Sequence, residues 1–265
     1  MNNKILININ NLDEIDIYKK ASITNFLFPL EEFSIGFKAF KLNEIPDNSY
    51  ILVNRIFDKK TLDNFIKIVP ELKRFKGILF EDIGVFNLLK NSNIDIELIW
   101  NQAHFVINYN SINFYLNNGC NSAVLSSDIT GNEIKEILSK VNKSIILPVF
   151  GNNMIMYSRR KLLTNYNTYN NIDNINDVIL DETHTNNKFF VRESDYGTVI
   201  FSNSEFNYFN FIKDIDDNKI KYYLICNINK SPEDIISIIN GKNIGNDGFL
   251  NKKTVYKMSE YTDRK

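Results

Sequence analysis

The sequence predicts an α/β fold, specifically a (β/α)8 barrel of the TIM type with an insertion between its seventh and eighth strands. Short apolar runs of strand length recur with helical segments between them, which is typical of repeated β-α units. The runs are almost continuously apolar, as expected for parallel strands that are buried on both faces. The length of 265 residues suits one barrel, which is typically about 250 residues long. We therefore expect a single domain over residues 1–265.

The elements follow one another in regular order. Eight candidate strands lie at residues 4–7, 23–28, 50–53, 77–80, 96–100, 123–126, 145–150 and 221–226. Helices fit at residues 61–69, 85–89, 111–117, 131–141, 204–212 and 232–239. The last helix has the clearest start, because Ser231 is a suitable cap and Pro232 suits the first helical position.

The segment between the seventh and eighth strands is too long for one helix and predicts the insertion, at about residues 165–203. It begins with an Asn-rich stretch, 165–176, and contains a predicted hairpin of residues 189–192 and 198–202. We expect the insertion to lie over the mouth of the barrel, meaning the opening at the carboxyl ends of the strands. We expect the tail, at 253–258, to pack back on the barrel.

Composition excludes several classes of protein. The 31 basic and 32 acidic residues give a net charge of −1, unlike a dedicated nucleic-acid coat, although a local basic patch is compatible with this balance. Cys120 and Cys226 lie far apart, and we expect both to be small buried apolar residues. No apolar stretch approaches the roughly 20 residues of a membrane span, and the N-terminus lacks the layout of a signal peptide. These features predict a cytoplasmic protein.

Polar residues follow most of the predicted strands, at the end where barrel enzymes place their functional groups. These positions are Asn54-Arg55, Glu81-Asp82, Asn101-Gln102, Ser127-Asp128, Gly151 and Asn227. They predict a polar pocket. Asp82 and Asp128 are candidates for a catalytic carboxylate pair that transfers protons, although acids here also form turns or cap helices. Asn54, Arg55 and Glu81 are candidates for binding a substrate.

The segment from 149 to 165 adds two adjacent arginines. Gly151 ends an apolar strand, where glycine permits a sharp turn or a close approach of a ligand. Arg159 and Arg160 then offer planar donors to a carboxylate, a phosphate or an RNA backbone, and a solvated basic turn is the alternative. Arg55 and Arg160 together are candidates for binding an anion or, instead, for bracing loops.

The remaining polar candidates indicate no recognised catalytic motif. Asn110 is a candidate substrate-binding residue, and its simplest role is to cap the helix that begins at Ser111. His104 lies among apolar residues and is expected to be packed, whereas His184 is expected to be exposed. Two histidines do not form a zinc cluster, and Gly245 to Gly248 lacks the features of a phosphate loop. Spacing alone reveals no nucleophile with its base.

Several short motifs resemble one known family in order and spacing. The motifs are Asp82-Ile83-Gly84, Asn110 with Gly119, Val124 to Asp128 with Glu133, Phe150-Gly151, Tyr157-Ser158, Arg160, Leu162-Leu163-Thr164 and Gly197-Thr198. Together they resemble the signature region and flanking segments of the collagenase-like peptidase family U32. The resemblance covers most of the chain and implies a barrel fold.

The resemblance also has an important exception. Family members that bind an iron–sulfur cluster use four cysteines, two of them inside the signature, and this chain has Met154 and Lys161 at those two positions. Its two cysteines cannot supply four thiolates. We therefore expect neither a cluster nor another cofactor, and we identify no metal ligands.

The resemblance implies three possible functions. Several U32 members are implicated in hydroxylating RNA bases or quinone precursors, often as paired subunits, so this chain is expected to be a smaller subunit beside a larger U32 partner. Its pocket, with Arg55, Asp82, Asp128 and Arg160, would then bind RNA or an anionic small molecule. The first alternative is a peptidase, as the family label says. The second alternative is a non-catalytic binding or scaffold barrel.

Overall fold

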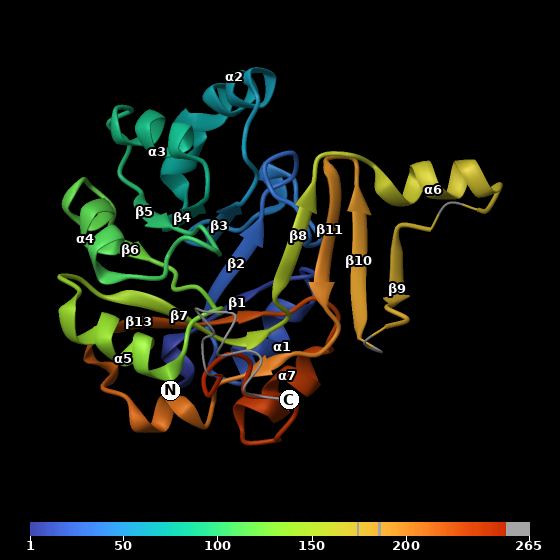
Figure 1. Ribbon diagram of the computed structural model, residues 1–265. Coiled ribbons are helices and arrows are strands. Elements are labelled where there is room, and N and C mark those ends of the chain that lie inside the picture. Colours follow the sequence, from blue (N-terminus) through green and yellow to red (C-terminus); the bar gives the residue numbers. More distant parts are fainter. Residues whose placement is uncertain (174, 185–186, 253–265) are drawn as a thin grey trace, which may run out of the picture.

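The computed structural model describes residues 1–173, 175–184 and 187–252. Its main body is a curled parallel sheet with helices on its outer face (Figure 1). The predicted tail segment 253–258 lies outside the described residues. Within the described chain, no helix is both long enough and apolar enough to span a membrane.

All eight predicted barrel strands are present. They are β1 (Ile5–Asn8), β2 (Asn25–Pro29), β3 (Tyr50–Val53), β4 (Gly77–Phe80), β5 (Glu97–Trp100), β6 (Ser122–Ala123), β7 (Ile145–Gly151) and β13 (Ile220–Cys226). They pair in parallel in the order β7-β13-β1-β2-β3-β4-β5-β6. A short strand, β12 (Phe206–Asn207), pairs antiparallel with the free edge of β7.

One parallel bridge connects the two ends of this sheet. It pairs Val124, just after β6, with Ile146 of β7, and the Leu125 amide donates to the Ile146 carbonyl oxygen at 2.9 Å. The fold is therefore mixed α/β with a curled, half-barrel parallel sheet, consistent with a TIM-like arrangement.

Five of the six predicted helices are present. They are α2 (Lys59–Ile68), α3 (Ile83–Lys90), α4 (Tyr109–Asn117), α5 (Gly131–Lys140) and α7 (Pro232–Ile239), and α1 (Glu14–Lys20) is an additional one. Short 3-10 helices lie at η1 (Asn2–Lys4), η2 (Leu42–Glu44), η3 (Val69–Arg74), η4 (Phe211–Asp214) and η5 (Asp217–Lys219).

The regular alternation of strand and helix fails at two places. The connection from β2 to β3, which is fully described, contains only η2 and no α-helix. The helix predicted at 204–212 is wrong: this segment forms β12 and then enters η4. The backbone of Phe206 pairs with Gly151, and the Tyr208 amide donates to the Val149 carbonyl oxygen at 2.7 Å, so pairing with β7 replaces the helical hydrogen bonds.

The sheet encloses a narrow apolar interior, distinct from the larger core between the sheet and the helices. One inward-facing residue from each strand or strand end contributes to it: Leu6, Leu27, Leu52, Leu79, Ile99, Val124, Ile146 and Leu224. Since side chains alternate along a strand, residues two positions further face the same interior at the mouth.

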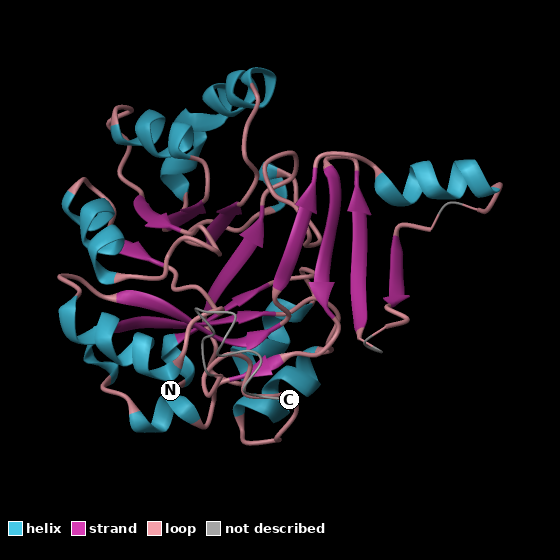
Figure 2. Ribbon diagram, viewed as in Figure 1, coloured by secondary structure: helices cyan, strands magenta, loops and turns pink. Residues whose placement is uncertain are grey.

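A second sheet of four antiparallel strands lies beside the mouth (Figure 2). Its strands are β8 (Met154–Ser158), β9 (Asp177–Asp181), β10 (Lys188–Ser194) and β11 (Gly197–Ser202), in the order β8-β11-β10-β9, and α6 (Leu162–Asn170) connects β8 to β9. The predicted hairpin is present as β10 and β11. The sheet includes β8, which precedes the predicted insertion boundary at 165.

The second sheet packs on loops that follow β2 and β13. Val199 and Phe201 of β11 form an apolar cluster with Ile35 and Ile228. Gly36 has a φ of +78°, and a Cβ atom there would lie 2.7 Å from the Phe201 ring. The absence of a side chain at Gly36 thus permits the close approach of the second sheet to the loop that follows β2.

Candidate functional site

A cavity of about 100 Å³ lies at the mouth, between the strand ends and the second sheet. We call it the mouth cavity. Its lining residues are Asn8, Leu27, Phe37, Leu52, Asn54, Leu79, Glu81, Asn101, Ala103, Val124, Leu125, Ser127, Pro148, Asn152, Met154, Phe201, Phe206, Leu224 and Cys226. A groove of about 290 Å³ between the second sheet and the end of β13 shares Asn152 and Cys226 with it.

The polar lining residues continue the inward register of the strands. Asn8, Asn54, Glu81 and Asn101 each lie two positions after an inward-facing apolar residue of β1, β3, β4 and β5. The same alternation turns the following residue away from the cavity. This explains why Asn54 and Glu81 line the mouth cavity whereas Arg55 and Asp82 do not.

Most of these polar groups already have partners within the protein. The Asn8 amide donates to the Asn227 carbonyl oxygen at 2.7 Å. Asn54 bonds both the amide and the carbonyl of Ile35, at 2.9 and 3.2 Å, and therefore positions the loop after β2. Ser127 donates to Asn153 at 2.7 Å. These side chains are structural supports of the mouth.

Glu81 and Asn101 are different. Neither side chain has a hydrogen-bond or ion-pair partner among the residues that the structure describes. Burial raises the pKa of the Glu81 carboxyl from 4.5 to about 8, because the surroundings disfavour the ionised form. Glu81 is therefore an acid that stays protonated at neutral pH. A carboxyl group of this kind is a recognised feature of functional sites.

Arg55 and Asp82 have structural roles beside the cavity. Arg55 is buried, donates to the Glu32 carbonyl oxygen and lies with its guanidinium carbon 4.6 Å from the centre of the Tyr196 ring. Asp82 caps α3 by accepting from the Gly84 amide at 2.6 Å, and its second oxygen accepts from the Phe57 amide at 2.8 Å. Both oxygens of Asp82 are thus engaged by backbone donors.

Asp128 forms a pair that the sequence did not reveal. Its Oδ2 lies 2.9 Å from Nδ1 of His104, which is 53% exposed. The expectation that His104 is packed is therefore wrong. A carboxylate bonded to Nδ1 leaves Nε2 of His104 available for proton transfer. No Ser, Thr or Cys side chain in the described parts of the chain hydrogen-bonds this histidine.

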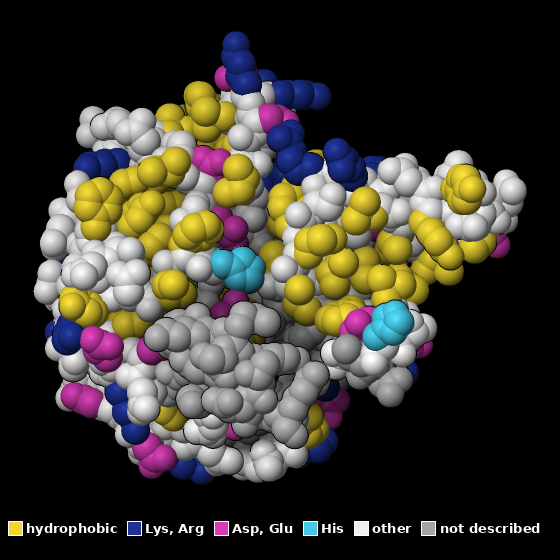
Figure 3. All heavy atoms as spheres, viewed as in Figure 1, with side chains coloured by type: hydrophobic (Ala, Val, Ile, Leu, Met, Phe, Trp, Pro, Cys, Tyr) yellow, Lys and Arg dark blue, Asp and Glu magenta, His cyan; other side chains and the backbone are white. Residues whose placement is uncertain are grey.

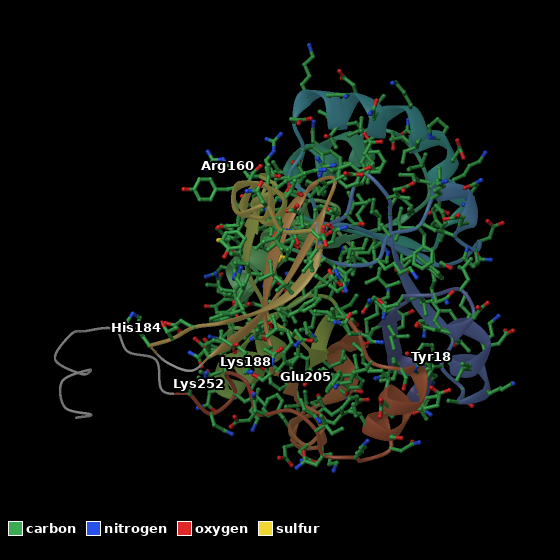
Figure 4. All side chains as sticks on the ribbon, turned by 90° about the vertical axis from the view of Figure 1, so that its right-hand side faces the viewer. Tyr18, Arg160, His184, Lys188, Glu205 and Lys252 are labelled. Carbon is green, nitrogen blue, oxygen red and sulfur yellow. The ribbon has the colours of Figure 1, made fainter. Side chains whose placement is uncertain are left out.

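Asn110, Arg159 and Arg160 lie away from the mouth cavity. Asn110 is exposed on α4, and the cap of that helix is Asn108, which accepts from the Ser111 amide at 2.9 Å. The expected cap at Asn110 is therefore wrong. Arg159 bonds Asp58 at 2.6 Å. Arg160 is exposed, and it lies at the tip of the second sheet in Figure 4, far from Glu205.

The four residues Arg55, Asp82, Asp128 and Arg160 do not gather around one cavity. None of them lines the mouth cavity. Arg160 follows β8, a strand that begins at the cavity with Met154 and extends away from it for about 13 Å, at about 3.3 Å per residue. The expectation that these residues share one anion-binding pocket is therefore wrong, because neither Arg55 nor Arg160 lines the mouth cavity.

The thiols do not fit a metal cluster. Cys226 ends β13 at the mouth, whereas Cys120 is buried just before β6, at the opposite end of the parallel sheet. Burial raises the pKa of each thiol to about 12, so both stay protonated. Lys161, at a ligand position of the resemblance, bonds Asp195 at 2.7 Å. Within the described residues, no group of three His, Cys, Asp or Glu side chains is arranged to hold a metal ion.

Comparison with known proteins identifies the family. The model of peptidase family U32 matches residues 27–262, which is most of the chain and includes the ends of all the parallel strands except β1. The chain belongs to peptidase family U32. The resemblance seen in the sequence is thereby confirmed.

Two individual similarities are informative. The tRNA hydroxylation protein P2 of Bacillus subtilis (strain 168) is 24% identical over 201 residues, which cover 71% of this chain. The match spans 64% of that relative's length, which is less than two thirds of it. Among solved structures, the U32 peptidase Mk0906 aligns with 86% of this chain and 94% of its own, with a TM-score of 0.50 and 9% identity. This second likeness concerns the fold alone.

Proposed function

We propose that this U32 protein acts in an RNA or small-molecule hydroxylation system, as a subunit that lacks an iron–sulfur cluster of its own. The observation that supports this most directly is its similarity to the tRNA hydroxylation protein P2 of B. subtilis. The replacement of two signature cysteines by Met154 and Lys161 supports the absence of a cluster. We further propose that the curled sheet closes as a TIM-type barrel, since the bridge from Val124 to Ile146 spans its two ends.

A strip of cations where α2 meets the second sheet supports an RNA substrate. Exposed Lys59 and Lys60 begin α2, and exposed Arg159 and Arg160 follow β8. The bond between Arg159 and Asp58 brings these two segments together. Figure 3 shows dark blue side chains gathered where α2 meets the second sheet. Lysine and arginine side chains bind the phosphates of a nucleic acid without reading its sequence.

A partner subunit has separate support. Large apolar side chains are exposed over the second sheet and α6, where Figure 3 shows a broad yellow area. The exposed large apolar residues of β8, α6, β9 and the segment between α6 and β9 are Ile155, Met156, Leu162, Tyr166, Tyr169, Ile172, Ile175, Ile179 and Leu180. Successive residues of a strand point to opposite faces, so part of this set lies on the face seen in Figure 3. Contiguous apolar surface of this kind marks interaction sites in soluble proteins. We propose that a larger, cysteine-bearing U32 protein covers it.

The peptidase alternative gains no support from the site. The pair of His104 and Asp128 supplies a base, but no nucleophile hydrogen-bonds it among the described residues. The scaffold alternative is distinguished by experiment. If the protein binds its partner but neither RNA nor a small molecule, the scaffold explanation holds.

The decisive test is deletion of the gene followed by mass spectrometry of tRNA and rRNA nucleosides. We expect one hydroxylated nucleoside to disappear and to return with the wild-type gene. Unchanged nucleosides would contradict an RNA substrate. RNA binding is then measured at several salt concentrations. For the double variant Lys60→Ala, Arg160→Ala, the slope of log affinity against log salt is expected to become less negative by about 0.7–0.9 per lost phosphate contact. Lys20→Ala, which replaces an exposed lysine of α1, is the control.

A further inference from the structure

The mouth cavity is suited to an uncharged group. Its walls are mostly apolar, with Leu27, Phe37, Leu52 and Leu79 among them. No Lys, Arg or His side chain is among its described lining residues. An anion would therefore lose its hydration without gaining a charged partner, which costs several kcal/mol. The ligand that fits the cavity differs from the phosphates that fit the cation strip.

Glu81 and Asn101 project from adjacent strands. Phe80 of β4 pairs with Trp100 of β5 in parallel register, and the two polar residues follow directly. The Asn101 amide nitrogen of the backbone donates to the Phe80 carbonyl oxygen at 2.8 Å, so the pairing extends to the mouth. Neighbouring strands lie about 4.8 Å apart. Two unpartnered polar side chains at this spacing can bind neighbouring atoms of one small ligand.

The protonated state of Glu81 decides which ligand atoms it matches. A neutral carboxyl offers an O–H donor beside a carbonyl acceptor, whereas a carboxylate only accepts. A neutral carboxyl therefore forms two parallel hydrogen bonds with a ligand in which an N–H lies next to a carbonyl. It donates its O–H to the ligand carbonyl and accepts from the ligand N–H. The other titratable side chain in the described lining is the Cys226 thiol of β13. Arg55 after β3 and the pair of His104 and Asp128 after β5 and β6 lie outside the lining.

The size of the cavity limits the ligand to one ring. A cavity of about 150 Å³ in an engineered protein binds benzene. The mouth cavity, at about 100 Å³, is smaller but open toward the adjoining groove. One ring therefore fits with part of its edge in the opening, and a fused double ring does not.

We propose that the mouth cavity binds a single uncharged ring with adjacent N–H and C=O groups, a cyclic amide, through the side chains of Glu81 and Asn101. The proposal deepens the proposed function and rests on it only for the source of the ring, which is then a base of an RNA. A free heterocycle has the same recognition chemistry. The experiment below separates the two sources.

The test uses 2-pyridone as the probe, because it has the required edge and stays uncharged over the pH range used. Binding to the full chain is followed by NMR, and a dissociation constant of about 1 mM is expected for so small a ligand. Between about pH 6 and about pH 9.5, wild-type affinity is expected to fall about 30-fold as Glu81 ionises.

Three variants make the result specific. Glu81→Gln keeps a donor and an acceptor without a titrating proton, so it is expected to bind with the same affinity at both pH values. Glu81→Leu is expected to weaken binding more than about tenfold. Glu71→Gln, on an exposed glutamate, is the matched control and should behave as wild type. Circular dichroism establishes that each variant is folded.

Each outcome has a definite meaning. Wild-type binding that is equal at both pH values, binding undiminished in Glu81→Leu, or no binding of 2-pyridone would overturn the ring site. If 2-pyridone binds as expected but gene deletion leaves RNA nucleosides unchanged, the ring site stands with a free heterocycle as ligand and the proposed RNA function fails. If an RNA oligonucleotide displaces 2-pyridone and the Glu81→Leu variant abolishes that displacement, RNA is the source of the ring.

Discussion

The two ends of the interior of the curled sheet differ in how their polar groups are satisfied. At the amino end, the Tyr50 hydroxyl lies 3.1 Å from both Glu97 Oε2 and the Tyr222 hydroxyl, Lys76 donates to Tyr222 at 2.8 Å, and Lys221 bonds Glu97. At the carboxyl end, Glu81 and Asn101 have no partners within the described chain. A satisfied buried network stabilises a fold, whereas polar groups that line a cavity without a protein partner can bind a ligand. The polar groups at the amino end are therefore structural, and the carboxyl end is where we propose that a ligand binds.

The largest effect on stability is expected at the amino end, where the polar groups have partners. Tyr50→Ala removes a fully buried ring and its hydrogen bonds, and we expect it to lower the free energy of unfolding by about 3–5 kcal/mol. Chemical denaturation measures this change. Tyr50→Phe keeps the ring and should cost only about 1–2 kcal/mol. An equal loss in both variants would show that the hydroxyl network, rather than packing, dominates.

The second largest effect on stability depends on pH and is expected at the carboxyl end, at Glu81. The pKa of Glu81 is about 8 in the folded protein and 4.5 ordinarily, so the folded state holds one more proton between these values. Wild-type stability therefore falls as pH rises through this window. Glu81→Gln does not titrate, and above about pH 8 we expect it to be more stable than wild type by about 2–4 kcal/mol.

Thermal unfolding at a series of pH values measures the difference in stability between Glu81→Gln and the wild type. Below about pH 4.5 the carboxyl is protonated in both states, so the difference should vanish. A variant less stable than wild type at high pH would indicate that ionised Glu81 has a partner and would remove the contrast between the two ends.

A smaller effect on stability is expected for Asp82, which lies one residue from Glu81 but outside the mouth cavity. Asp82→Ala removes the cap of α3 and the bond to Phe57, at a cost of about 1–2 kcal/mol in the free energy of unfolding. Asp82→Asn retains acceptor capacity and should cost less. Loss of ligand binding in Asp82→Asn without any loss of stability would instead place Asp82 in the site.

The smallest effect on stability is expected at Arg160. Its guanidinium is exposed and has no partner in the described chain, so Arg160→Ala should change the free energy of unfolding by less than about 0.5 kcal/mol. Arg55→Ala is the contrasting variant, because Arg55 is buried, bonds the Glu32 carbonyl oxygen and stacks on Tyr196. Equal melting temperatures of the two variants would contradict the structural role of Arg55.

The sequence was sufficient to predict the parallel strands but not every helix. Apolar runs such as that of β7 are buried along their whole length, so their pattern is strong. In α6, Asn167 is the one buried residue, and in α1 it is Tyr18, so neither helix has an apolar face to recognise. Such helices depend on their tertiary surroundings.

At two strand ends, the residues selected from the sequence include one that lines the mouth cavity. Both members of Asn54-Arg55 and of Glu81-Asp82 were selected, and the alternation along each strand separates them into a lining residue and a supporting one. Counting two positions on from Leu52 and Leu79 would have made this distinction from the sequence. The pair of His104 and Asp128 joins two different loops, and no local pattern records such a contact.

Gly151 permits the close approach of β7 and β13 at their carboxyl ends. Its φ is +149°, and a Cβ atom there would lie 2.6 Å from the Cys226 carbonyl oxygen, so β7 and β13 touch backbone to backbone. Any other residue would require these two strands to move apart at this point. The tight seam between β7 and β13, next to the cavity-lining Cys226, therefore depends on a missing side chain.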